Sequence, residues 1–197
     1  MSRDTPDYLR LPLGQFLDLV ASEDPAPAGG SVAAVAVALA AGLSTMAARL
    51  STDHLADAPK LEARSDSLRI SIAPLAQADA MAYGRVLAAR REGRNIQDAL
   101  SQAADVPLAV AEAGAEVAEI SSRLARDGNP NLEGDAISAA LLAEAAVRAT
   151  ARLARINLSS ASVEDGRLAR AGELVQAASS ARSAAEDSRQ GTSPDTL

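Results

Sequence analysis

Roughly a quarter of this chain is alanine, whereas aromatic residues make up only 2% of its 197 positions. Alanine is the best helix former, and β-branched residues are sparse. Small side chains also let helix axes approach closely, because little volume separates them. The composition therefore predicts an all-α protein with tightly packed helices.

Apolar residues recur at helical spacing in several segments that polar or proline-containing stretches separate. Pro74 and Pro107 interrupt two of these segments, and we expect each to kink its helix because proline lacks a backbone N–H. We predict a bundle of five or six largely up-and-down helices in one domain, residues 11–187, between a flexible N-terminus, 1–10, and a disordered tail, 188–197. The surplus of small apolar helix surface predicts a homodimer. The expected helices cover residues 11–22, 30–49, 61–91, 95–125, 135–158 and 165–187.

Charge and residue usage exclude several classes of function. The net charge of −7 argues against nucleic-acid binding, which needs a clustered basic surface. Without cysteine, the chain has no disulfide and no thiolate nucleophile. A single histidine, His54, excludes a ferritin-like di-metal site, so we expect no metal. The apolar run Val32–Leu43 is too short to span a bilayer, and no N-terminal targeting signal appears, so we expect a cytoplasmic protein without a membrane partner.

The stretch Asp24–Leu43, DPAPAGGSVAAVAVALAAGL, joins a proline- and glycine-rich turn to a helix of small residues. Such a turn can leave free N–H groups at the helix entrance, and glycine lets a ligand approach the backbone closely. No strand precedes it and no Gly-Lys-Ser/Thr follows, so it is neither a dinucleotide-binding nor a P-loop motif. The simpler alternative is a tight turn without a ligand. As candidate binding residues we take Pro27, Gly29, Gly30 and Ser31, with Ser31 near the N-cap.

Asp79 has small or apolar neighbours at helical spacing, within AQADAMAYGRVL. A carboxylate on such a face is partly desolvated, and its raised pKa suits proton transfer near neutral pH. An exposed aspartate on a helix edge is the equally supported alternative.

Further polar residues lie around the expected helix 135–158. Asn129, Asn131 and Asp135 gather at its entrance, although favourable placement at the positive helix end would also explain the carboxylate. Asn157 follows an apolar face, and a buried amide there needs hydrogen-bond partners, which a polar site would supply.

Four segments together resemble the family of formiminotetrahydrofolate cyclodeaminases and methenyltetrahydrofolate cyclohydrolases. DPAPAGGSVAAVAVALAAGLSTMAARL is similar to the family's Pro-Ala-Pro-Gly-Gly-Gly-Ser motif and the small-residue helix that follows it. DAMAYGRVLAA, AADVPLAVAEAG and GNPNLEGDAISAALLAEAA resemble three further family segments and occur in the family's order. The resemblance spans about Leu11 to Asp165.

The resemblance implies an all-α dimer with folate sites in clefts near the dimer interface. It implies one of two reactions: release of ammonia from 5-formimidoyltetrahydrofolate to give 5,10-methenyltetrahydrofolate, or hydrolysis of that product to 10-formyltetrahydrofolate. Neither reaction requires a metal or redox cofactor, and both need proton transfer. We therefore predict Asp79 and Asp135 as catalytic residues, and Pro27, Gly29, Gly30, Ser31, Asn129, Asn131 and Asn157 as substrate-binding residues.

The sequence also departs from the family pattern. Ala28 stands where the family usually has a glycine, and Gly134 stands where it often has serine. The segment STDHLADAPK lacks the usual Thr-x-Gly-Lys-Lys, which removes candidate basic contacts to the glutamate tail of folate. A catalytically silent helical scaffold of the same fold is therefore the alternative function.

Overall fold

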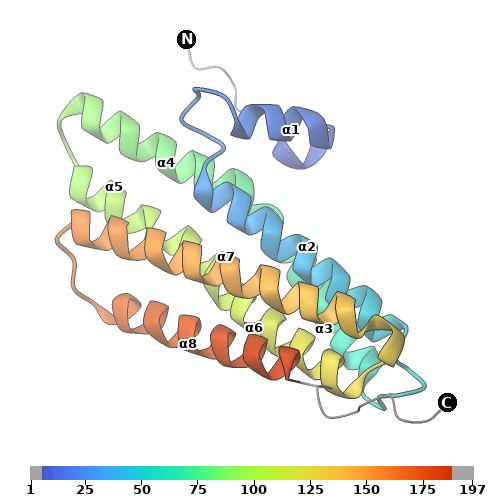
Figure 1. Ribbon diagram of the computed structural model, residues 1–197. Coiled ribbons are helices and arrows are strands. Elements are labelled where there is room, and N and C mark those ends of the chain that lie inside the picture. Colours follow the sequence, from blue (N-terminus) through green and yellow to red (C-terminus); the bar gives the residue numbers. More distant parts are fainter. Residues whose placement is uncertain (1–5, 188–197) are drawn as a thin grey trace.

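The computed structural model describes residues 6–187, and every regular element in that range is helical (Figure 1). The predicted all-α class is confirmed. The long helices run side by side as a bundle, and the residues 188–197 of the predicted tail lie outside the described range. The elements are η1 (Tyr8–Arg10), α1 (Leu13–Val20), α2 (Gly29–Arg49), α3 (Ala58–Ile72), α4 (Leu75–Glu92), α5 (Ile96–Ala103), α6 (Asp105–Asp127), η2 (Pro130–Leu132), α7 (Glu133–Ser160) and α8 (Gly166–Glu186).

At each of the two expected proline kinks the helix is interrupted, although the one or two residues between the resulting helices keep helical φ/ψ. α3 ends before Pro74, which is the N-cap residue of α4. α5 ends at Ala103, and Pro107 lies in the first turn of α6. Proline donates no hydrogen bond to the carbonyl four residues earlier, so a helix breaks at or just before it. When each interrupted pair is counted as one helix, the described chain has six helices, as predicted.

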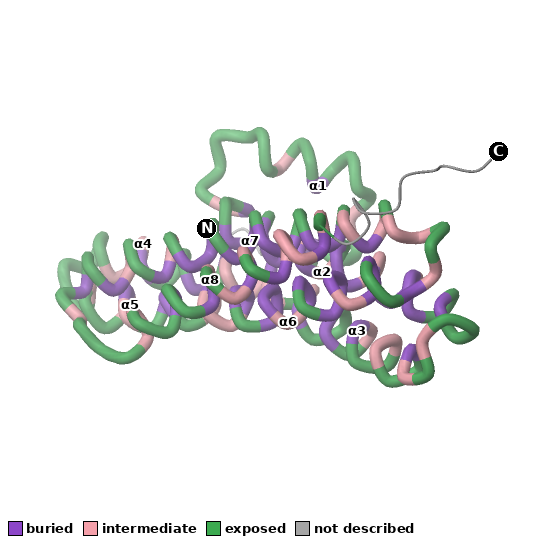
Figure 2. Tube along the Cα trace, turned by 60° about the horizontal axis from the view of Figure 1, so that its bottom comes forward, coloured by how far each residue is buried: buried purple, intermediate pink, exposed green. Residues whose placement is uncertain are grey.

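Small residues set the distance between helices in the core. Alanine is the commonest buried residue in each of α2, α6 and α7, as the composition predicts. Figure 2 shows where the buried positions lie along these helices. At Gly114 of α6, an added Cβ would lie only 2.7 Å from a Val147 methyl group of α7 and 3.2 Å from one of Val37 in α2. The three helix backbones therefore meet where only glycine fits.

α2 is longer than the apolar run in the sequence indicates. Its 21 residues, with a mean hydropathy of 1.9 over the most apolar window, are long and apolar enough to cross a membrane. However, 56% of that window is buried inside the bundle, and Ser31, Ser44 and Thr45 on its buried side are all hydrogen-bonded. α2 packs against α3, α4, α6 and α7, so its length and apolar composition do not by themselves identify it as a membrane span.

The N-terminal segment lies across the bundle and is mostly exposed (Figure 2). α1 forms as predicted, but only Phe16 of its apolar residues is buried, whereas Leu13 and Leu17 are exposed. Phe16 packs edge-on against Tyr8, with ring centroids 5.7 Å apart. Of the predicted flexible segment 1–10, residues 8–10 form η1, and residues 1–5 lie outside the described range.

Candidate functional site

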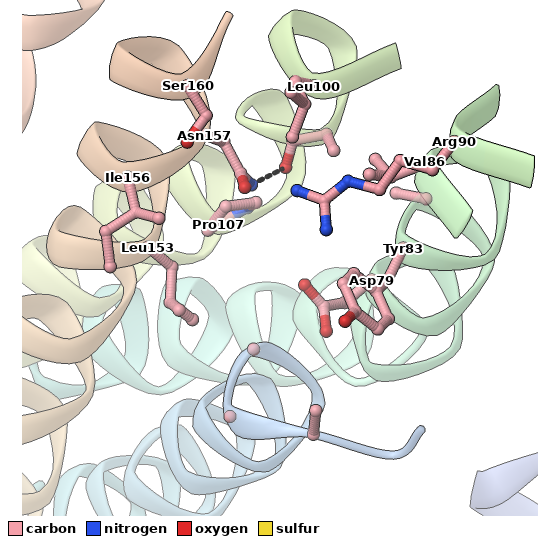
Figure 3. A pocket seen from close by; sticks show the side chains of 15 residues that line it. Asp79, Tyr83, Val86, Arg90, Leu100, Pro107, Leu153, Ile156, Asn157 and Ser160 are labelled. Atoms are coloured by element: carbon pink, nitrogen blue, oxygen red, sulfur yellow. Dashed lines mark hydrogen bonds between the residues drawn. The ribbon is translucent and has the colours of Figure 1, made fainter. Parts of the chain in front are cut away.

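A cleft opens between the first turn of α2, one side of α4, the α5–α6 junction and the last turns of α7 (Figure 3). Its walls are mainly apolar, and its volume is about 260 Å³. Drug-sized ligands occupy roughly 300–1,000 Å³, so a ligand of that size must extend beyond this cleft. The polar side chains that line it are Asp79, Tyr83, Arg90, Asn157 and Ser160.

Asp79 is half-buried in this cleft, so the desolvation predicted from its neighbours is confirmed. Burial raises the pKa of its carboxyl, and hydrogen bonds from the hydroxyl and the backbone N–H of Ser31 oppose that rise. The Ser31 Oγ lies 3.2 Å from the Asp79 Oδ2 and 2.8 Å from the Ala76 carbonyl oxygen. A hydroxyl has one proton to donate. When that proton goes to Ala76, a protonated Asp79 can itself donate to Ser31.

The position of the Asp79 side chain requires a glycine at residue 30. A Cβ added at Gly30 would overlap the Asp79 carboxylate, which therefore rests against the first turn of α2. Gly30 lines the cleft, and the space beside its Cα, which we expected a ligand to approach, holds the side chain of Asp79. Asp79 thus lies at the positive end of the α2 dipole, which favours its ionised form.

The other residues of the glycine-rich turn have different surroundings. Gly29 lines the cleft, and a Cβ added to it would lie 3.8 Å from Leu153. Pro27 is buried and does not line the cleft. Ser31 lies in the first turn of α2, near the N-cap as predicted, and the N-cap residue Ala28 makes no side-chain hydrogen bond. The Ser31 hydroxyl faces α4, where it bonds Ala76 and Asp79.

Asn157 reaches the cleft from α7 and is half-buried. Its Nδ2 donates a 3.0 Å hydrogen bond to the Ala103 carbonyl (Figure 3). Ala103 lies four residues before Pro107, so this is the carbonyl that the proline leaves without a helical donor. The buried amide of Asn157 therefore finds its hydrogen-bond partner in the carbonyl that the helix interruption frees. This bond fixes the amide beside the cleft.

The remaining predicted site residues lie at the other end of α2. The Oδ1 of Asn129 accepts a 3.0 Å hydrogen bond from the N–H of Asn131. The Nδ2 of Asn129 donates a 3.0 Å hydrogen bond to the Leu50 carbonyl. Its own N–H donates to Ser51 Oγ at 2.9 Å. Asp135 is half-buried in the first turn of α7. These bonds fasten the α6–α7 connection to the C-terminus of α2.

The predicted residues therefore form two groups within one chain. The first surrounds Gly30 at the start of α2, and the second surrounds Leu50 just after its end. At 1.5 Å per residue, the 21 residues of α2 separate the two groups by about 30 Å. The cleft that contains Asp79 is lined by no member of the second group.

Sequence reasoning missed three polar residues of the cleft: Tyr83, Arg90 and Ser160. A signal was available for the first two, because they follow Asp79 by four and eleven residues. Those spacings place them on the same side of one helix, one turn and three turns later. Ser160 follows the predicted end of its helix and had no comparable signal.

The single histidine lies away from the cleft. His54 is exposed in the connection between α2 and α3, at the end of α2 opposite Asp79. Within residues 6–187, no three His, Asp or Glu side chains gather where they could hold a metal ion.

Comparison with known proteins relates this chain and its fold to proteins named as folate enzymes. The family model described as Formiminotransferase-cyclodeaminase matches residues 12–176, which include both groups of predicted site residues. A methenyltetrahydrofolate cyclohydrolase of Methylorubrum extorquens is 32% identical over 159 residues, covering 72% of this chain and 76% of that protein. The crystal structure of a formiminotetrahydrofolate cyclodeaminase from Thermotoga maritima matches with a TM-score of 0.83 and 28% identity, covering 90% of this chain and 95% of that one.

Proposed function

Because this chain belongs to the formiminotransferase-cyclodeaminase family, we propose that it is a folate one-carbon enzyme acting as a methenyltetrahydrofolate cyclohydrolase. The observation that carries the proposal is the half-buried Asp79, held at the start of α2 in an otherwise mainly apolar cleft. Its raised pKa suits a group that accepts and returns a proton near neutral pH. The 32% identical cyclohydrolase favours hydrolysis as the reaction.

In the proposed reaction, the oxygen of a water molecule bonds to the methenyl carbon between N5 and N10, and the water gives one proton to Asp79. The carbon is then tetrahedral and bears a hydroxyl group. The bond from carbon to N5 breaks as the hydroxyl becomes a carbonyl, Asp79 returns its proton to N5, and the hydroxyl proton leaves to solvent. The product is 10-formyltetrahydrofolate, and the net release is one proton. Ser31 holds the Asp79 carboxylate in place throughout.

The second candidate is cyclodeaminase activity, which the match to the Thermotoga maritima structure favours. Here N10 of 5-formimidoyltetrahydrofolate attacks the formimidoyl carbon, and its proton passes to the imino nitrogen. A protonated Asp79 gives this nitrogen a second proton, so that ammonia leaves and 5,10-methenyltetrahydrofolate forms. Both reactions pass through a tetrahedral carbon between two nitrogens, so the same carboxylate serves either one.

We also propose that the protein acts as a homodimer. The neighbouring helices α2 and α7 both expose apolar side chains: Leu39 is 63% exposed, and Val32, Leu142 and Ile156 are also exposed. Apolar side chains repeated along two adjacent helices are typical of an interface between protein chains. A two-fold axis makes such a surface self-complementary.

Antiparallel pairing through α2 would also complete the site. A two-fold axis across the middle of α2 places its first turn beside the end of the partner's α2. Asp79 of one protomer would then face the Asn129–Asp135 segment of its partner, which is about 30 Å away within a single chain. The small volume of the cleft supports this arrangement, because a folate must extend out of it.

Folate binding separates this proposal from a silent scaffold. We expect 5-formyltetrahydrofolate at about 100 times its dissociation constant to stabilise the native protein by about 2.7 kcal/mol. For a chain of this size, that raises the melting temperature by roughly 5–10 °C, measurable by differential scanning fluorimetry. A melting temperature that stays constant up to millimolar ligand would favour the scaffold.

A further inference from the structure

Arg90 is the only basic side chain among the residues that line the cleft (Figure 3). It lies in the last turn of α4, is exposed, and extends into the open space between Asn157 and Asp79. Among residues 6–187, no carboxylate forms an ion pair with it, whereas Arg94 nearby pairs with Glu92. Its positive charge is therefore available to a ligand.

The wall between Asp79 and Arg90 is apolar. Eleven residues separate the two along α4, which corresponds to about 16 Å. Ala82 and Val86 lie between them on the same side of the helix, and Leu153 also lines the cleft. Such a wall suits a flat aromatic ring, with the Asp79 carboxylate beside the cleft and the Arg90 guanidinium extending into its open space.

We propose that Arg90 binds a carboxylate of the glutamate tail of the folate substrate. This inference rests on the proposed function, which places the reacting carbon near Asp79. In folate, the p-aminobenzoyl ring follows N10 and carries the glutamate at its far end. The ring then lies along the Ala82–Val86 wall, and the glutamate reaches Arg90. Guanidinium and carboxylate form two parallel charge-assisted hydrogen bonds, so this contact sets affinity for the tail.

The last turn of α4 also contains a matched control. Basic residues near a helix C-terminus are favourable because of the helix dipole, and this applies equally to Arg90 and Arg91. Arg91 is also exposed, but it does not line the cleft. A difference between variants of these two residues therefore reports on the cleft rather than on helix stability.

The test compares Arg90→Ala, Arg90→Lys and Arg91→Ala in steady-state kinetics. Two substrates are used: 5,10-methenyltetrahydrofolate and the corresponding tetrahydropteroate amide, in which a neutral carboxamide replaces the glutamate. We expect Arg90→Ala to raise KM for the folate at least about tenfold with little change in kcat, the signature of lost substrate binding. Its KM for the pteroate amide stays at the wild-type value. Arg90→Lys gives an intermediate KM, and Arg91→Ala behaves as wild type.

An unchanged KM in Arg90→Ala, or an equal rise for both substrates, would overturn the assignment of Arg90. Failure of the proposed function looks different, because the wild-type protein then converts neither substrate. In that case, calorimetric titration with p-aminobenzoylglutamate and the neutral p-aminobenzamide still decides the role of Arg90. Tighter binding of the glutamate compound by wild type, lost in Arg90→Ala, supports the assignment, and equal binding of both compounds refutes it.

Discussion

Asp79→Asn is expected to lower kcat about 10²- to 10⁴-fold without lowering the melting temperature at pH 7. The loss follows because an amide keeps the shape of the carboxyl group but cannot accept or return the proton that the reaction requires. The hydrogen bonds persist, since an Asn side chain can accept from the Ser31 N–H and donate to the Ser31 Oγ.

The stability of the Asp79→Asn variant follows from the direction of the pKa shift. Burial raises the pKa of Asp79 above its ordinary value of 3.8. A raised native pKa contributes stability below the unfolded pKa, and this contribution is lost as the pH rises through the native pKa. At pH 7 the wild-type protein therefore bears the cost of a desolvated charge, which the neutral amide removes. We expect the variant to be at least as stable as wild type at pH 7, with a smaller difference at lower pH.

Thermal unfolding and steady-state kinetics check both parts of this prediction. Asp98→Asn, which changes an exposed carboxylate on α5, is the matched control and should keep the wild-type rate. A folded Asp79→Asn protein with full turnover would rule out the proton-transfer role. A variant that unfolds at a lower temperature would instead show that the carboxylate is mainly structural.

A heterodimer of Asp79→Asn and Asp135→Asn protomers is expected to regain about half of the wild-type activity, although each variant homodimer is nearly inactive. The reason is geometric. If each site takes Asp79 from one protomer and Asp135 from its partner, the heterodimer has one site with both changes and one intact site. Co-expression of the two chains with different affinity tags isolates the heterodimer for assay.

Three results of this mixing experiment would contradict a shared site. A heterodimer as inactive as its parents would place both carboxylates in one protomer's site. A fully active Asp135→Asn homodimer would remove Asp135 from catalysis and leave only its favourable position at the start of α7. Light scattering that gives the mass of one protomer at every concentration would exclude the dimer itself.

Much of the fold could be predicted from the sequence because alanine and proline act locally. Alanine content indicated helices, and Pro74 and Pro107 marked where two of them break. The extent of each break was not predictable, because it depends on what satisfies the freed backbone groups. Near Pro107, the freed carbonyl of Ala103 accepts a hydrogen bond from the side chain of Asn157, which is 50 residues from Pro107 in the sequence.

The candidate site was less predictable because its distances are tertiary. The neighbours of Asp79 at helical spacing indicated a half-buried carboxylate, and the structure contains one. We expected Gly30 to make room for a ligand, whereas the space beside it holds the Asp79 carboxylate, 49 residues later in the sequence. Asn129 and Asp79 also looked like members of one site, but α2 holds them at opposite ends of the bundle. The sequence patterns of two motifs do not show how far apart the helix between them places the two motifs in space.

The absorbance of 5,10-methenyltetrahydrofolate, followed after addition of the purified protein, tests folate one-carbon chemistry most directly. We predict that its absorbance falls faster than in buffer alone, at a rate proportional to protein concentration, as hydrolysis to 10-formyltetrahydrofolate requires. An increase of the same absorbance from 5-formimidoyltetrahydrofolate would identify the cyclodeaminase reaction instead. A folded protein that changes neither signal above the buffer rate would contradict an enzymatic role.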